Sequence, residues 1–90
     1  LGEHHSGELK RESAQAKAER IIAEELKGRN WSERDLKLRI KSDPEKLALA
    51  ARLRRETTLT LPAIAARLQM GSWKSFRAKL HRWRKAQETL

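Results

Sequence analysis

The sequence LPAIAARLQMGSWKSFRAKL, from Leu61 to Leu80, has the pattern of two short helices joined by a tight turn. Thr60 is placed to cap the first helix, which we expect to end near Gln69, because a threonine side chain can accept from the free amides of a first turn. Ser72 can cap the second helix in the same way, just after a glycine that breaks the chain. This stretch therefore predicts a helix-turn-helix unit.

The apolar residues of this stretch predict which side of each helix is buried. Ile64 and Leu68 are expected to face the core, and Met70 to fill the turn. Ala65 is expected where the second helix crosses the first closely, because its side chain is small. The second helix carries apolar residues at spacings of three, four and three, which is one face of a helix. We expect that face to consist of Trp73, Phe76, Leu80 and Trp83.

A third helix is predicted directly upstream of this unit. Asp43 can accept from free amides and Pro44 needs no donor at the first helical position, so the pair begins a helix that runs to about Glu56. We expect it to bury Leu47, Ala50 and Leu53.

The first part of the chain predicts two more helices. One runs over about residues 7–27 and ends at Gly28, a common helix stop. The other runs over about residues 33–41, capped by Ser32, with Asp35 at the capping-box position. The buried stripe of the longer helix is expected to hold Ala14, Ala18, Ile21, Ile22 and Leu26.

Composition agrees with an all-α fold of about five short helices. The chain has 90 residues, no Tyr, one Phe and two Pro, and it is rich in helix formers. We divide it into residues 1–43, a flexible lead-in plus a supporting helical arm, and residues 44–90, the helix-turn-helix unit. It has no Cys and no apolar run near the roughly 20 residues that cross a bilayer. The expected location is the cytoplasm, with no membrane partner.

Charge is divided unevenly along the chain. Through Glu45, ten basic residues match ten acidic ones, whereas from Lys46 onward there are eleven basic residues and two acidic ones. The net charge of +9 therefore belongs entirely to the second half. A field of one sign attracts a polyanion, so nucleic acid is the expected partner and the nucleoid the expected place.

Together these features predict a DNA-binding helix-turn-helix whose second helix enters the major groove. Residues in its first turns would contact bases, and we expect these to be Ser72, Lys74, Ser75, Arg77 and His81. Phosphate contacts, which give affinity without sequence choice, are expected from Arg52, Arg54, Arg55, Arg67, Lys79, Arg82, Arg84 and Lys85.

Other functions have weaker support in the sequence. His4 and His5 lack a third ligand at metal spacing, and neither Ser72 nor Ser75 has a neighbouring histidine base, so we expect no metal, no cofactor, no small-molecule ligand and no catalysis. Trp31 is expected to pack at a helix start rather than stack on a base. Structured RNA would suit the same charge. A helical protein-interaction module, in which the stripe of the first helix forms a homodimer seam, is a second alternative, and a membrane-surface helix over residues 72–90 is a third.

Five further stretches are informative as a set: residues 2–7 (GEHHSG), 12–22 (ESAQAKAERII), 31–36 (WSERDL), 52–60 (RLRRETTLT) and 70–73 (MGSW). They resemble one kind of bacterial protein, the C-terminal region of REP-associated tyrosine transposase-like proteins. The resemblance covers nearly the whole chain, and residues 52–73 are its most specific part.

This resemblance implies a domain that follows a nuclease domain and assists recognition of DNA, including hairpin-forming repetitive elements. The family's catalytic machinery is a His-hydrophobic-His metal site and a nucleophilic Tyr. Here His4 and His5 are adjacent and Tyr is absent, so no catalytic residue is carried over.

Overall fold

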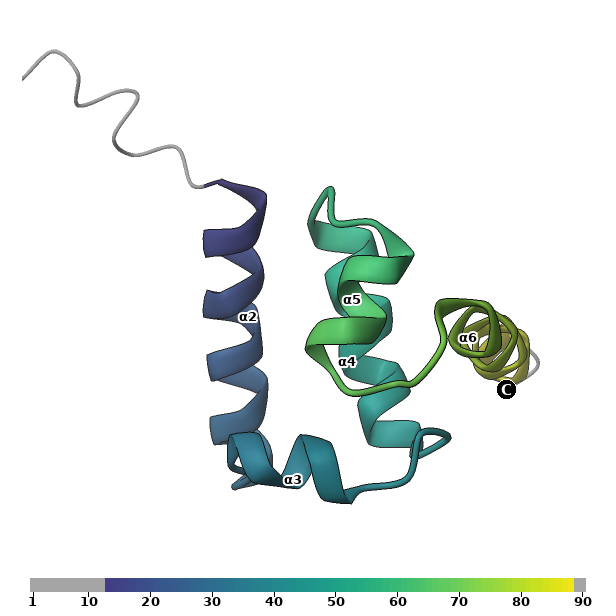
Figure 1. The fold of residues 1–90 in the computed structure, drawn as a ribbon, viewed down its shortest axis with the longest axis horizontal. Helices are drawn as coiled ribbons and strands as arrows, with labels where there is room; N and C mark the ends of the chain where they lie inside the picture. The colour runs from purple at the N-terminus through teal and green to yellow at the C-terminus, as the bar shows by residue number, and fades with distance from the viewer. Residues whose placement is uncertain (1–12, 89–90) are drawn as a thin grey trace, which may run out of the picture.

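The computed structural model describes residues 13–88, and within that part the chain forms five helices and no strand (Figure 1). The all-α prediction is confirmed. The expected lead-in and the His4-His5 pair lie outside the described residues. The helix predicted over about residues 7–27 does not run through residue 13, because Ser13 is extended and its side chain caps a helix that begins at Ala14. The helices are α2 (Ala14–Arg29), α3 (Glu33–Leu38), α4 (Pro44–Glu56), α5 (Leu61–Arg67) and α6 (Trp73–Glu88).

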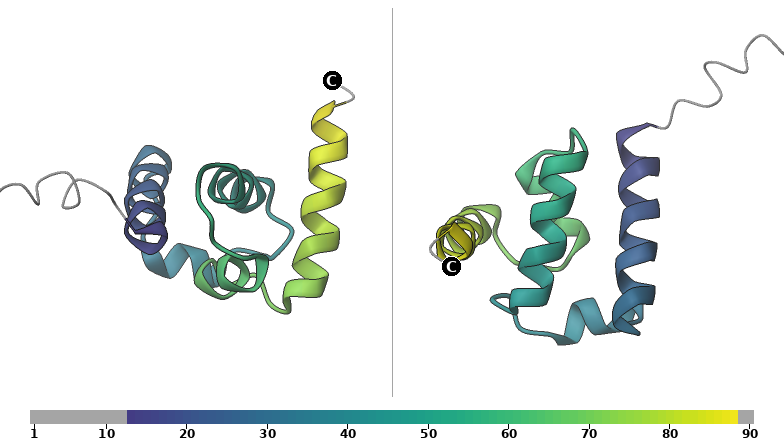
Figure 2. Two further views of the ribbon diagram at one scale, coloured as in Figure 1. Left: turned by 90° about the horizontal axis from the view of Figure 1, so that it is seen from above. Right: turned by 180° about the vertical axis from the view of Figure 1, so that it is seen from behind.

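The helices are arranged in three layers. α4 and α5 form the middle, α2 lies along one side of α4, and α6 packs on the other side, crossing the direction of α4 (Figures 1 and 2). The short α3 connects the end of α2 to the start of α4 (Figure 1). The predicted arm and the predicted helix-turn-helix unit therefore lie against each other, and α6 is on the far side from the arm.

One hydrophobic core joins all five helices. It is built from apolar residues at helical spacing, including the predicted stripe of α4 and that of α2 from Ala18 onward. Ala14 was predicted to belong to the buried stripe, but it is only half-buried at the first position of α2 and lies outside the core. The expectations for the turn are confirmed, since Ala65 and Met70 are both buried. The core consists of Ala18, Ile21, Ile22, Leu26, Leu36, Leu47, Leu49, Ala50, Leu53, Ile64, Ala65, Leu68, Met70, Phe76 and Leu80.

The three tryptophans differ in how far they enter this core. Trp73 was predicted to be part of the buried face of α6, but it is 38% exposed at the first position of the helix and is not packed against the core. Trp83 is half-buried against the core. Trp31 also packs against it, and the Arg39 guanidinium lies 4.0 Å from the centre of its ring, so the predicted packing role of Trp31 is confirmed.

Helix starts follow the predicted caps. Thr60 Oγ1 accepts from the Ala63 amide at 3.3 Å. An Asp43 carboxylate oxygen accepts from the Glu45 amide at 2.8 Å, and Pro44 stands at the first position of α4. The Ser32 amide donates to the Asp35 carboxylate at 2.6 Å, which is one half of the predicted capping box.

Helix ends differ from prediction at three places. Gly28 does not stop α2; Asn30 does, with a left-handed φ of 60° that asparagine tolerates. α3 ends at Leu38 instead of residue 41, because the chain becomes extended at Arg39. α5 ends at Arg67 instead of Gln69, which takes a left-handed φ of 58°.

Candidate nucleic-acid interface

The turn between α5 and α6 is held by a compact set of backbone hydrogen bonds. The Met70 amide donates to the Ala65 carbonyl at 2.8 Å, and the left-handed Gln69 amide donates to the Ala66 carbonyl at 3.4 Å. This is the Schellman arrangement, which satisfies the last carbonyls of α5 and reverses the chain. It sets the position from which α6 begins.

A buried lysine, Lys46, holds this turn through hydrogen bonds to backbone carbonyls. The Lys46 side chain is fully buried, and its ammonium donates to the carbonyls of Leu36 at 2.7 Å and Gln69 at 3.2 Å, with Arg39 at 3.5 Å. Burial lowers the pKa of Lys46, because an ammonium loses hydration in the core. The same ammonium thus ties the end of α3 and the α5–α6 turn to α4.

Sequence reasoning missed Lys46, although a signal was present. Lys46 lies on the same helical stripe as Ala50 and Leu53, four and seven residues later. A charged residue at a core position of a predicted stripe indicates a buried polar contact.

Gly71 completes the turn. Its φ of 78° is in the left-handed region, and a Cβ there would lie 2.8 Å from Cε of Lys41. The left-handed φ favours glycine at this position, and any other residue would in addition displace the flexible end of the Lys41 side chain. Ser72 then caps α6, its Oγ accepting from the Ser75 amide at 3.3 Å.

The predicted base-contact residues lie together on the exposed side of α6 and its cap. Lys74, Ser75, Arg77 and His81 are all exposed, while Phe76 and Leu80 anchor the opposite face in the core. The predicted anchoring of α6 is therefore confirmed for these two residues, and the polar side chains of its first turns are free to meet a partner.

Basic residues continue along α6 to its end. Within residues 13–88, none of the basic side chains of this helix forms an ion pair; Lys79 alone has a side-chain hydrogen bond, from its Nζ to Ser75 Oγ at 2.7 Å. A long helix with uncompensated positive charge presents a strong field to a polyanion. These basic residues are Lys74, Arg77, Lys79, Arg82, Arg84 and Lys85.

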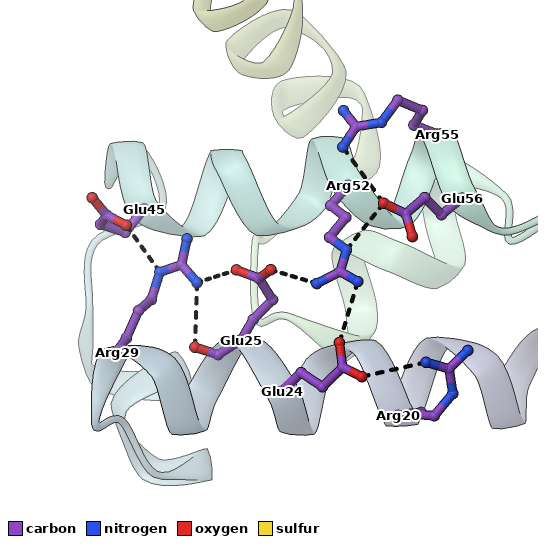
Figure 3. A network of polar contacts seen from close by, with 8 residues as sticks. All are labelled: Arg20, Glu24, Glu25, Arg29, Glu45, Arg52, Arg55 and Glu56. Carbon is purple, nitrogen blue, oxygen red and sulfur yellow. Dashed lines mark hydrogen bonds and ion pairs between the residues drawn. The ribbon is translucent and has the colours of Figure 1, made fainter.

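Arg52, predicted to bind phosphate, instead faces α2. Its guanidinium donates to Glu25 at 2.6 Å, to Glu24 at 3.2 Å and to Glu56 at 3.1 Å (Figure 3). Its hydrogen bond to Glu25, and next its hydrogen bond to Glu56, raise the pKa of Arg52. With its donors committed to three carboxylates, Arg52 is removed from the candidate interface.

Arg67 is engaged in the same way on α5. It pairs with Glu19 of α2 at 2.6 Å and with Glu33 of α3 at 2.8 Å, and hydrogen bonds to these carboxylates raise its pKa. The hydrogen bond from Arg67 in turn lowers the pKa of Glu19, although partial burial opposes the shift. Arg67 is therefore also removed from the candidate interface.

These ion pairs separate charge across the molecule. Carboxylates of the arm neutralise the arginines that face it, and Arg29 likewise pairs with Glu45 of α4 at 2.9 Å (Figure 3). Arg54 and Arg55, at the end of α4, are exposed, and among the described residues Arg55 approaches the Glu56 carboxylate at 3.6 Å while Arg54 has no ion pair. Positive charge without an ion pair, within residues 13–88, therefore gathers on α6 and at the adjoining Arg54.

The stripe of α2 considered as a dimer seam is used within the chain. Ile21 is fully buried and Leu26 is nearly so, and both belong to the core shared with α4. These side chains are not available to a second copy in this structure.

Three further observations bear on other functions. Within residues 13–88 no group of His, Asp or Glu side chains has an arrangement that could hold a metal ion. No helix in that part combines the length and apolar character needed to span a bilayer. Comparisons with models of known families, with curated proteins and with solved structures gave no match.

Proposed function

We propose that this chain is a non-catalytic DNA-binding module that places the exposed face of α6 in the major groove. The observation that carries the proposal is the separation of charge. Arginines facing the arm are neutralised by it, whereas six basic residues on α6 have no ion pair within residues 13–88. A phosphate backbone supplies the missing negative charge.

The geometry of α6 supports a division of labour along the helix. Its first two turns carry short and long polar side chains suited to base edges, with Arg77 able to give two hydrogen bonds to a guanine. Its last turns carry Arg82, Arg84 and Lys85, which suit phosphates. We propose DNA, on the nucleoid of the cytoplasm, as the partner, and a transposase-like protein as the setting in which this recognition acts.

Binding is tested by fluorescence anisotropy with a labelled DNA duplex, a DNA hairpin and an RNA hairpin, each at 50 and 200 mM salt. We expect DNA to bind, with affinity falling by about 1000-fold or more if six phosphates are contacted. Preference for the RNA hairpin would replace DNA by structured RNA. No binding to any of the three at low salt would refute the proposal and leave the basic face as a protein-docking surface.

Two variants test the assignment of roles. Arg77→Ala should weaken a selected site by about 5-fold or more and random DNA much less, because it removes a base contact worth about 1–3 kcal/mol. Arg84→Ala should weaken both alike. Lys27→Ala, an equal loss of charge on the exposed side of α2, is the matched control and should change neither. Equal effects of Arg77→Ala on selected and random DNA would contradict the base-reading role.

A further inference from the structure

A hollow of about 320 Å³ lies between the end of α4 and the second half of α6. It continues into a second hollow of about 180 Å³ toward the start of α5, which shares Arg54, Leu80 and Arg84 and adds Arg77 and His81. We refer to the two as the arginine groove. The larger hollow is lined by Ala51, Arg54, Arg55, Leu80, Trp83 and Arg84.

The walls of the arginine groove are cationic on both sides. Arg54 and Arg55 come from α4, and Arg77 and Arg84 come from α6. No carboxylate is among the residues that line either hollow. Within residues 13–88, only Arg55 of these four has an ion pair, at 3.6 Å to Glu56, and Figure 3 shows it on the side of α4 away from α2. Planar guanidinium groups suit phosphate oxygens better than ammonium groups do.

The floor of the groove is apolar. Leu80 is buried, and the half-buried Trp83 indole closes the hollow beside Ala51. A lone inorganic anion would leave this floor unused. A ligand with phosphates at its edges and a carbon-rich body between them matches both features, and the sugar-phosphate backbone of a nucleic-acid strand has that composition.

The opposite flank of α6 has a different character. The hollow there, of about 300 Å³, is lined by Ser42, Leu47, Lys79, Arg82 and Trp83. Both of its basic residues come from α6, and the Lys79 ammonium already bonds to Ser75. Of the hollows on these two flanks of α6, the arginine groove is the one whose cations come from two helices.

We propose that the arginine groove holds one backbone strand of the bound DNA, with phosphates on Arg54, Arg55 and Arg84 and deoxyribose against Trp83. This inference rests on the proposed function and adds α4 to the interface. α6 then lies in the major groove, while the end of α4 binds the backbone strand that borders this groove.

The first test removes charge from α4 alone. In the Arg54→Gln/Arg55→Gln protein, the slope of log affinity against log salt should fall by about two units, because each phosphate contact contributes about 0.9. Lys27→Gln/Lys37→Gln, the same loss of charge on exposed positions of α2 and α3, is the matched control and should leave the slope nearly unchanged. Circular dichroism checks that both variants fold.

The second test uses Trp83 as the reporter. In a Trp31→Phe/Trp73→Phe protein, Trp83 is the one remaining tryptophan. A random DNA duplex should reduce acrylamide quenching of its fluorescence at least twofold, and the reduction should be lost when Arg54→Gln/Arg55→Gln is added, at duplex concentrations that still saturate α6.

The outcomes separate the two proposals. If the unaltered chain binds duplex DNA but the α4 double variant behaves like the control, or Trp83 stays equally accessible, the strand does not lie in the groove and the proposed function stands. If the unaltered chain binds no DNA, both proposals fall.

Discussion

Replacing Lys46 tests how the α5–α6 turn is held. Lys46→Ala removes three buried methylene groups, worth about 0.8 kcal/mol each, from a side chain with no exposed surface. It also leaves the Leu36 carbonyl, now bonded at 2.7 Å, without its donor, at a cost of about 1–3 kcal/mol. We expect the free energy of unfolding to fall by about 3–5 kcal/mol.

Lys46→Met distinguishes the contribution of the buried methylene groups to stability from that of the ammonium. Methionine keeps most of the buried volume, and removing the ammonium recovers the desolvation that lowers the pKa of Lys46. We therefore expect a loss of only about 0–2 kcal/mol relative to the unaltered chain. Urea unfolding followed by circular dichroism at pH 7 measures both variants, with the exposed Lys37→Ala as a control that should stay within about 0.5 kcal/mol.

The pH dependence gives an independent readout of the same group. Because the pKa of Lys46 is lowered on folding, the unfolded chain binds more protons than the folded one between that lowered value and the ordinary 10.5. This group therefore makes stability rise with pH in that window, and Lys46→Met should lack the rise. A loss below about 1 kcal/mol for Lys46→Ala would refute the bracing role. Equal losses for Ala and Met would instead contradict the stabilising contribution assigned to the buried stem.

Further predictions concern the glycines and the arm. Gly71→Ala should destabilise by about 1 kcal/mol or more, because of its left-handed φ and the approach of Lys41, whereas Gly28→Ala should stabilise by up to about 1 kcal/mol; thermal unfolding of both compares them, and equal signs would contradict the argument. The hydrogen bond from Arg67 lowers the pKa of Glu19, so this pair should stabilise the fold fully above the ordinary pKa of 4.5 and lose its effect as pH falls through the lowered value. The stability difference between the unaltered chain and Arg67→Gln should therefore shrink between pH 6 and pH 3 in urea titrations, and a constant difference would contradict it.

Local signals predicted most of the helices correctly. The boundaries of α4 and the starts of α5 and α6 agree with the structure, because Thr60, Ser72 and the Asp43-Pro44 pair act on amides within three residues of themselves. Errors concentrate at helix ends. Gly28 is a good stop in isolation, yet α2 continues past it to Asn30, where Trp31 can reach the core.

Candidate site residues were predicted less evenly. The exposed basic residues of α6 follow from helical spacing, since Phe76 and Leu80 fix which face is buried. Arg52 and Arg67 looked equally suited to phosphate in the sequence. The carboxylates of α2 that pair with these two arginines lie 27 to 48 residues away from them along the chain. No local sequence pattern extends over such a separation.

The sequence by itself determined that the chain is helical, where most helices begin, and that its positive charge belongs to the second half, because these properties depend on composition and on neighbours a few residues apart. Only the tertiary structure decided which cations are free. Packing α2 against α4 brings Glu19 and Glu25 to Arg67 and Arg52 and buries Lys46 against the turn, whereas the basic residues of α6 and Arg54 have no ion pair within residues 13–88. The physical reason is that an ion pair depends on distance in space, and folding sets that distance.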